Sequence, residues 1–159
     1  MTTATESHWV GLDIGTVRHG VAVADPAGRL ALPLCVLAAQ PASTLAVRLL
    51  AALAGRTARA LVCGLPLDQY GNAGPAAQAV RHIATSLAGE LKLELHFVDE
   101  RYTTSAVQRP PEAGQHRQAG RRQQHPAAGN SRGKGRSGAP PDAQAAALIL
   151  QAFLDTHAG

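Results

Sequence analysis

The pattern of apolar and polar positions near the start of the chain predicts three β-strands. Apolar residues recur at about every second position from His8, from His19 to Asp25, and from Arg29 to Ala38. The sequence DPAG between the second and third segments contains proline and glycine, which favour a tight turn. Three strands joined by short turns form an antiparallel meander.

The spacing of apolar residues then changes to that of helices. Ser43 or Thr44 is placed to cap a helix that ends at Gly55, and Pro75 is placed to begin a second helix that ends at Gly89. The apolar stripe of the first helix is Leu45, Leu49, Leu50 and Leu53. The stripe of the second is Val80, Ile83, Ala84 and Leu87.

Two further apolar segments predict strands, and a third predicts a closing helix. ARALVCGLP (58–66) is continuously apolar, as strands buried on both faces are, and LELHFVDE (93–100) predicts a fifth strand. PDAQAAALILQAFLD (141–155) predicts the last helix. One face of that helix carries Ala146, Ile149, Leu150, Phe153 and Leu154.

This order of elements, three meander strands followed by α-β-α-β-α, predicts an α/β protein with a ribonuclease-H-like fold. The sheet is then mixed and five-stranded, with the first strand central, two further strands parallel to it, and helices flanking both faces. Ligands of such sheets gather beyond the carboxyl ends of the parallel strands. Asp13 ends the first strand and Glu100 follows the fifth, so we expect the two to converge.

Basic residues are concentrated in one segment, although the net charge of the chain is only +4. Between Ser105 and Pro141 there is a single acid, Glu112, and regular periodicity fails from about Pro110. The basic residues there are Arg109, Arg117, Arg121, Arg122, Arg132, Lys134 and Arg136. The segment is either a solvated linker or a phosphate-binding arm, and the two are compatible. We expect one domain over 1–159 with a basic low-complexity loop at about 109–141.

The remaining composition predicts a cytoplasmic protein without a membrane partner. No apolar run approaches the roughly 20 residues that span a bilayer, and MTTATESHWV does not have the pattern of a secretion signal. Cys35 and Cys63 stand alone, which favours buried thiols in a reducing compartment over a disulfide or a metal site.

Four motifs in order resemble the YqgF family of pre-16S ribosomal RNA nucleases, also described as Holliday junction resolvase-like. They are GLDIGTVRHGVAVADPAGRLALPLCVL, LVCGLPLDQYGNAGP, FVDERYTT and DAQAAALILQAFLD. The resemblance covers 9–108 and 142–155. It implies catalytic carboxylates at Asp13, Glu100 and Asp142. Gathered carboxylates need cations to stay ionised, and one or two Mg²⁺ or Mn²⁺ ions suit them.

Within that set the resemblance assigns Asp13 as the ligand shared between two metals, with Glu100 and Asp142 on either side. The role of Asp99 stays open, because neighbouring strand residues point to opposite faces and Asp99 then points away from Glu100, although this rule loosens at a strand end. Asp99 is either a further metal ligand or a residue that orients Arg101 or a metal-bound water. Each carboxylate also has an ordinary structural explanation. Asp13 precedes a turn, Asp142 is placed to cap the last helix, and Asp99 with Glu100 forms a polar strand end.

Phosphate contacts are predicted at a second group of side chains. The loop GLPLDQYGNAGP lies at the same sheet edge, where its glycines permit close approach to a ligand or simply an ordinary turn. Exposed Arg and Thr are common, so a contact role and a surface role stay open for these residues. They are Arg18, Arg101, Thr104, Arg117, Arg121 and Arg122.

One departure from the family affects Asp142. After the DER motif the family continues into a helix and a short basic loop, but here Pro110 and Pro111 break that helix and the linker is longer. Residues 109–141 read either as a true insertion or as a stretch translated out of frame. The placement of Asp142 is therefore the least secure of the three.

The resemblance predicts a metal-dependent nuclease, with processing of the 5′ end of pre-16S ribosomal RNA as the favoured activity. Cleavage of branched DNA as a Holliday junction resolvase is the alternative, and a stable dimer would favour it; we expect a monomer or a weak homodimer. A nucleic-acid-binding module without catalysis is a third possibility. LDIGT also resembles the phosphate-binding turn of sugar kinases and actin, but those proteins need two such lobes.

Overall fold

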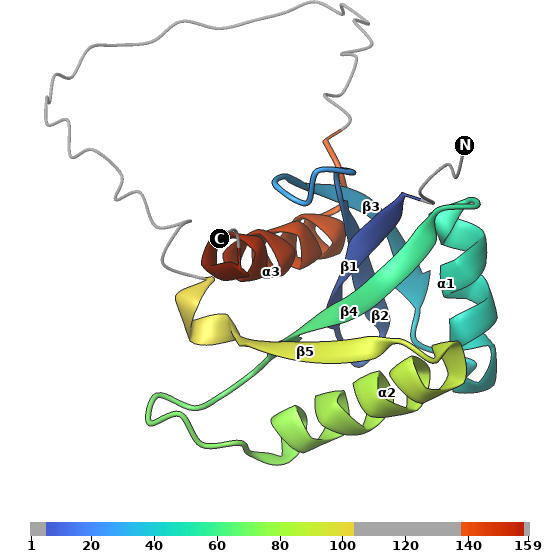
Figure 1. Cartoon of the computed structure of the whole chain (residues 1–159). Coiled ribbons are helices and arrows are strands. Elements are labelled where there is room, and N and C mark those ends of the chain that lie inside the picture. The colour runs from blue at the N-terminus through green and yellow to red at the C-terminus, as the bar shows by residue number, and fades with distance from the viewer. Residues whose placement is uncertain (1–5, 104–137, 158–159) are drawn as a thin grey trace, which may run out of the picture.

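The computed structural model describes residues 6–103 and 138–157, in which five strands and three α-helices form an α/β fold (Figure 1). Two short 3-10 helices, η1 (Ala42–Thr44) and η2 (Glu100–Tyr102), complete it. The strands are β1 (Ser7–Ile14), β2 (Arg18–Ala24), β3 (Ala31–Ala38), β4 (Thr57–Leu65) and β5 (Glu94–Asp99). The α-helices are α1 (Leu45–Leu53), α2 (Pro75–Leu91) and α3 (Pro141–His157).

The strands form one sheet in the order β3-β2-β1-β4-β5. The first three pair antiparallel, as the meander pattern predicts, whereas β4 pairs parallel with β1 and β5 parallel with β4. The central position of β1 and the two parallel additions confirm the predicted ribonuclease-H-like arrangement. The carboxyl ends of β1, β4 and β5 consequently lie at one edge of the sheet.

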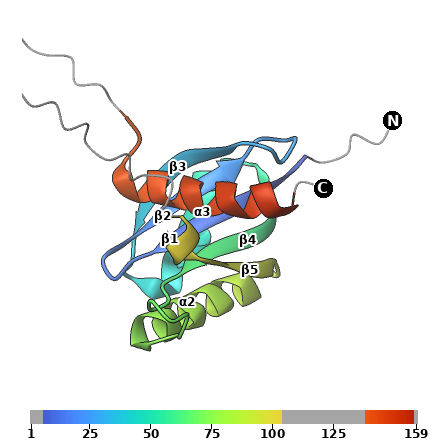
Figure 2. The ribbon, with the colours of Figure 1, turned by 90° about the vertical axis from the view of Figure 1, so that its left-hand side faces the viewer.

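Helices cover the two faces of the sheet unequally. Figure 1 shows α1 and α2 on one face and α3 on the other, and Figure 2 shows α3 lying across the strands. Alternate residues of β1 divide between these faces: Val10 and Leu12 pack with α1 and α2, and Trp9 packs with α3. The apolar face predicted for the last helix is buried throughout. It consists of Ala146, Ile149, Leu150, Phe153 and Leu154.

The helices α1 and α2 differ from the sequence predictions in three details. Thr44, one of the two predicted candidates, occupies the N-cap position of α1, but its side chain forms no capping hydrogen bond. Leu50 is 52% exposed instead of facing the core. Gly89 lies inside α2, which ends at Leu91 with Lys92 in the left-handed conformation (φ 54°). The Lys92 N–H donates to carbonyls of the last turn, so this lysine ends the helix as glycine commonly does.

Both cysteines are free, as predicted. Cys63 is fully buried in β4, and its burial, with the nearby Asp13 carboxylate, raises its pKa to about 12. Cys35 is half-buried, and burial raises its pKa as well. Both thiols are therefore poor nucleophiles at neutral pH. Within 6–103 and 138–157 no helix is long and apolar enough to cross a membrane.

Candidate active site at the carboxyl edge of the sheet

Asp13 lies at the end of the central strand, on the face that α3 covers. It shares this face with Trp9, two pleats earlier, and pairs across the ladder with Gly20 of β2. The side chain is half-buried. Burial and the nearby Asp142 carboxylate raise the pKa of Asp13 above its ordinary value of 3.8. Both causes disfavour the ionised form of Asp13, and a cation close by would favour it.

Glu100 faces the same side of the sheet. It begins η2 immediately after β5, and its carboxyl group lies over Gly64 of β4, where an added Cβ would stand 2.7 Å from Glu100 Oε1. Burial, then the charges of Asp13 and Asp99, raise its pKa above the ordinary 4.5. The charge of Asp13 thus acts on Glu100, so the two carboxyl groups lie near each other at this edge of the sheet.

Asp142 is brought to Asp13 by the packing of α3. It is the second residue of that helix, whose first turn presses on β2 so closely that a Cβ at Gly20 would collide with the Asp142 carbonyl. Gly11 and Gly64 admit the same helix at Leu150 and Ile149 respectively. Three strand glycines therefore allow the close approach, a role that sequence reasoning missed.

Arg18 forms an ion pair with Asp142 through its Nε. The guanidinium is 64% exposed and the carboxylate 31% exposed, so the pair lies at the surface beside Asp13. Arg18 was predicted as a phosphate contact, and its place at this edge is compatible with that role, which stays a prediction. The Arg18–Asp142 pair joins residues 124 apart in sequence. The sequence around either residue does not predict that the two form a pair.

The three carboxylates fit a hard divalent cation by donor type. Asp13 is coupled to Asp142 and to Glu100, which makes it the central member of the set. All the donors are oxygens, as Mg²⁺ and Mn²⁺ prefer. In the part of the chain that the structure describes, no three His, Cys, Asp or Glu side chains lie close enough together to hold a metal ion. In this arrangement the carboxylate of Asp142 is paired with the guanidinium of Arg18.

Asp99 points to the opposite side of the sheet from Glu100. It follows the pleat of Phe97, which packs with α2, and its carboxylate accepts from Arg101 at 2.9 Å (Nε to Oδ2) and 2.5 Å (Nη2 to Oδ2). The Arg101 side chain is the first cause of the lowered pKa of Asp99. Asp99 therefore orients Arg101, one of its three predicted roles; the other two, binding a metal and orienting a metal-bound water, stay predictions.

Arg101 also contacts the loop between β4 and α2. Its Nη1 donates to the Gln69 carbonyl at 3.3 Å, and a Cβ at Gly71, where φ is 84°, would stand 3.1 Å from its Nη2. Asp68 folds this loop by accepting from the backbone N–H groups of Tyr70 and Asn72. The glycine in the loop thus makes room for Arg101, and the pair with Asp99 holds the arginine there.

Several predicted contacts lie outside the described residues. Thr104 follows the last described residue of the first range, and Arg117, Arg121 and Arg122 belong to the basic segment. The alternative origins of residues 109–141, an insertion or a shifted frame, concern the same segment. A hollow of about 600 Å³ lies elsewhere, around Trp9 at the other end of β1.

Comparisons with known proteins identify the family. The chain matches the family described as "RuvX: Holliday junction resolvase" over residues 7–156. It is 43% identical over 108 residues to a "Putative pre-16S rRNA nuclease" of Rhodopseudomonas palustris (strain HaA2), covering 64% of this chain and 68% of that one. A protein of the same description from Roseiflexus sp. (strain RS-1) is 41% identical over 100 residues, covering 63% and 71%.

Among solved structures, Thermus thermophilus RuvC in complex with a Holliday junction substrate matches with a TM-score of 0.53. The match covers 96% of both chains at 14% identity, so it supports the fold alone. The family match spans both described ranges and the segment between them. The chain therefore belongs to the family described as "RuvX: Holliday junction resolvase", and it is a nuclease, a hydrolase that acts on phosphodiester bonds.

Proposed function

We propose that this nuclease depends on a divalent metal, Mg²⁺ or Mn²⁺, and cuts RNA during processing of the 5′ end of pre-16S ribosomal RNA. One observation supports the site above all: Asp13, Glu100 and Asp142 come from distant parts of the sequence to one face of the sheet. Two of these carboxyl groups have raised pKa values because they are buried beside another carboxylate. The relatives named as pre-16S rRNA nucleases support the substrate.

Each carboxylate has a distinct part in this proposal. Asp13, coupled to both neighbours, is placed to share a cation between them, while Glu100 and Asp142 hold the two sides. A bound Mg²⁺ or Mn²⁺ supplies Lewis acidity to the scissile phosphate and lowers the pKa of its water. Arg18 is placed to leave Asp142 for a phosphate oxygen, because a guanidinium pairs with either anion.

The contacts of Arg101 with Asp99 and with the loop between β4 and α2 support a role for Arg101 in positioning substrate. Its guanidinium is fixed by Asp99 and by the Gln69 carbonyl, so it needs little further ordering to meet a backbone phosphate. Thr104, Arg117, Arg121 and Arg122 remain sequence-based candidates for further phosphate contacts. One domain over 1–159, acting as a monomer or weak homodimer, is part of the same proposal.

A resolvase acting on branched DNA is the second candidate, and the description of the matched family favours it. A carboxylate-metal site cuts either backbone, so the site does not separate the two. Resolution of a two-fold junction needs two active sites, which a stable homodimer would supply. A nucleic-acid-binding module without catalysis is the remaining alternative.

A cleavage assay with purified protein separates these functions. Wild type and Asp13→Asn are incubated with Mn²⁺ and either single-stranded precursor RNA or a four-way DNA junction. The oligomeric state of each protein is measured separately by light scattering. We expect wild type to cut the RNA and Asp13→Asn to bind it without cutting. Preferential junction cleavage by a dimer would establish the resolvase. Binding without cleavage of either substrate by wild type would establish the module.

A further inference from the structure

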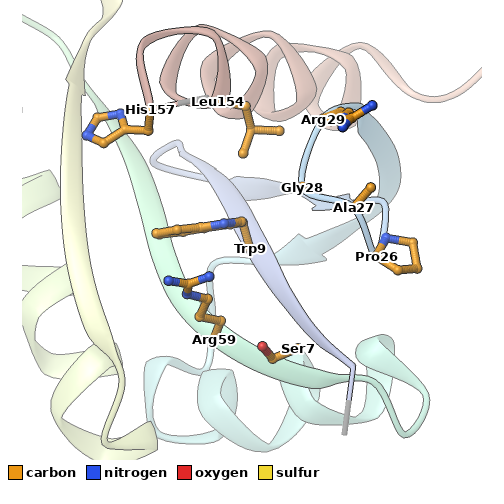
Figure 3. Close-up of a pocket in the computed structure, with 9 residues that line it drawn as sticks. All are labelled: Ser7, Trp9, Pro26, Ala27, Gly28, Arg29, Arg59, Leu154 and His157. Atoms are coloured by element: carbon orange, nitrogen blue, oxygen red, sulfur yellow. The ribbon is translucent and has the colours of Figure 1, made fainter. Parts of the chain in front are cut away.

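A hollow lined by tryptophan and arginine lies at the end of β1 opposite to Asp13 (Figure 3). Its volume of about 600 Å³ is within the range of roughly 300–1,000 Å³ typical of small-molecule sites. The side chains around it come from the starts of β1 and β4, the turn after β2, and the end of α3. They are Ser7, Trp9, Pro26, Ala27, Arg29, Arg59, Leu154 and His157, with Gly28 in the turn.

The wall of this hollow is fixed by aromatic packing. Trp9 packs against Phe153 with 4.9 Å between ring centroids and against His96 with 5.6 Å. The turn approaches the indole from another side, since a Cβ at Gly28 would lie 3.7 Å from its Cδ1. Trp9 is therefore held in one orientation before any ligand arrives.

Arg59 extends this rigid wall with a planar cation. Its guanidinium carbon lies 4.7 Å from the centroid of the Trp9 ring, and Figure 3 shows it beneath the indole, with Leu154 above. Such stacking prearranges the guanidinium plane, while its outer side stays exposed. A stacked guanidinium is a surface on which nucleobases pack.

The charge of the hollow favours an anion. Arg29 and Arg59 both line it, no carboxylate does, and within 6–103 and 138–157 neither guanidinium forms an ion pair. Asp25 accepts from backbone N–H groups, that of Arg29 among them, and these bonds and the Arg29 charge lower the Asp25 pKa, whereas Asp155 accepts from Gln151. Two unpaired cations beside a stacking surface suit a ligand that combines a flat ring with a phosphate.

We infer that this hollow is a nucleotide-binding site separate from the carboxylates, in which a base packs on the Arg59–Trp9 pair and the phosphate meets Arg29. Trp9 and Asp13 lie four residues apart on one face of β1, about 13 Å along the strand, with α3 packed over the face between them. The nucleotide is either free or part of an RNA strand held away from the cut. The site rests on no part of the cleavage chemistry.

Tryptophan fluorescence tests this site directly, because Trp9 is the only tryptophan of the chain. Wild-type protein in EDTA, where no metal-dependent cleavage occurs, is titrated with adenosine 5′-monophosphate, with a pentameric RNA and with inorganic phosphate. We expect saturable changes of emission with the nucleotides and a much weaker response to phosphate. A pentamer that binds at least tenfold more tightly than the mononucleotide assigns the site to a strand; equal affinities assign it to a free nucleotide.

Arg59→Gln is the test variant, and Arg81→Gln is its matched control. Arg81 also stacks on an aromatic ring, with its guanidinium 5.4 Å from the centroid of Phe97, but it does not line the hollow. We expect Arg59→Gln to weaken nucleotide binding about fivefold or more, and Arg81→Gln to leave it unchanged. Asp13→Asn should bind like wild type, so failure of the carboxylate assignment and failure of this site are distinguishable.

Three results would overturn the inference. The first is no nucleotide binding, checked by equilibrium dialysis so that binding without a change of emission is still detected. The second is a phosphate response as strong as that of the nucleotide, which would make the hollow a general anion site. The third is equal binding by Arg59→Gln and Arg81→Gln.

Discussion

The backbone of Asp142 rests on Gly20, the residue that pairs with Asp13 in the neighbouring strand. One contact thus fixes the distance between the first and the last carboxylate of the proposed site. Any side chain at position 20 would force the first turn of α3 off the sheet, and Asp142 with it.

Gly20→Ala is therefore expected to lower the cleavage rate strongly, although it adds only one methyl group and removes no catalytic side chain. A displacement of about 1 Å in a catalytic group costs about a hundredfold in rate, and overpacking costs about 1–3 kcal/mol of stability. Cleavage rate and thermal denaturation measure the two effects. Gly89→Ala is the matched control, because nothing lies within 4 Å of an added Cβ there and the position is helical. Full activity in Gly20→Ala would show that α3 can shift without consequence.

Asp13→Asn is expected to stabilise the metal-free protein while abolishing cleavage. The folded pKa of Asp13 is raised, so its protonated form favours folding below pH 3.8, and this contribution is lost as pH rises through the folded pKa. At neutral pH the carboxylate is a cost that asparagine removes. We expect the Tm of Asp13→Asn in EDTA to lie above that of wild type, as measured by thermal denaturation of both proteins at neutral pH.

Metal should reverse that order of stability. Mn²⁺ that binds only the folded protein stabilises it by RT ln(1 + [Mn²⁺]/Kd), so the Tm of wild type should rise with metal and that of Asp13→Asn should not. Glu100→Gln should behave in the same way, because its pKa is raised by burial and by Asp13. Equal metal-induced shifts in all three proteins would remove Asp13 and Glu100 from the metal site.

Asp99→Asn is expected to reduce cleavage less than Glu100→Gln does. Asp99 faces away from Asp13 and acts through Arg101, so its loss loosens a positioning residue and leaves the other carboxylates in place. Its lowered pKa gives stability above its ordinary value of 3.8 that is lost as pH falls. The measurement is the cleavage rate at matched Mn²⁺ concentration, with Arg101→Lys as a second variant that keeps charge but loses the fork. A larger loss in Asp99→Asn would make Asp99 the metal ligand.

The sheet was predictable from local sequence, and the assembly of the site was only partly so. Alternation gave the meander, and the continuously apolar 58–66 indicated a strand covered on both faces, so Asp13 and Glu100 were expected at one edge. The strand ends at Asp99 and η2 begins at Glu100, which carries the two neighbours to opposite faces as the pleat predicts.

The missing information was long-range. Nothing local distinguishes Gly20, on which α3 rests, from a glycine that merely weakens a strand. The partner of Arg18 is equally hidden, since Asp142 lies 124 residues away. The hollow at Trp9 joins four distant segments, and HWVGLDIG alone indicated only a strand. The end of α2 was predicted wrongly for a different reason: the left-handed conformation that ends the helix is adopted by Lys92, whereas the sequence favours it at Gly89.

The basic segment carries the last prediction, which stands on sequence because most of its residues lie outside 6–103 and 138–157. Seven positive charges against one acid between Ser105 and Pro141 should meet phosphates when RNA binds. Each phosphate contact on a single strand contributes about −0.7 to the slope of log affinity against log salt. The six-fold variant replaces Arg117, Arg121, Arg122, Arg132, Lys134 and Arg136 with glutamine.

We expect that variant to bind RNA more weakly and with a flatter salt dependence, while its requirement for metal is unchanged, because that belongs to the carboxylates. Affinity is measured by filter binding between about 50 and 200 mM salt, a range over which phosphate contacts weaken steeply. Arg81→Gln, on α2, serves as the control for loss of a charge from another surface. An unchanged slope would make the segment a solvated linker that only carries the chain to Asp142.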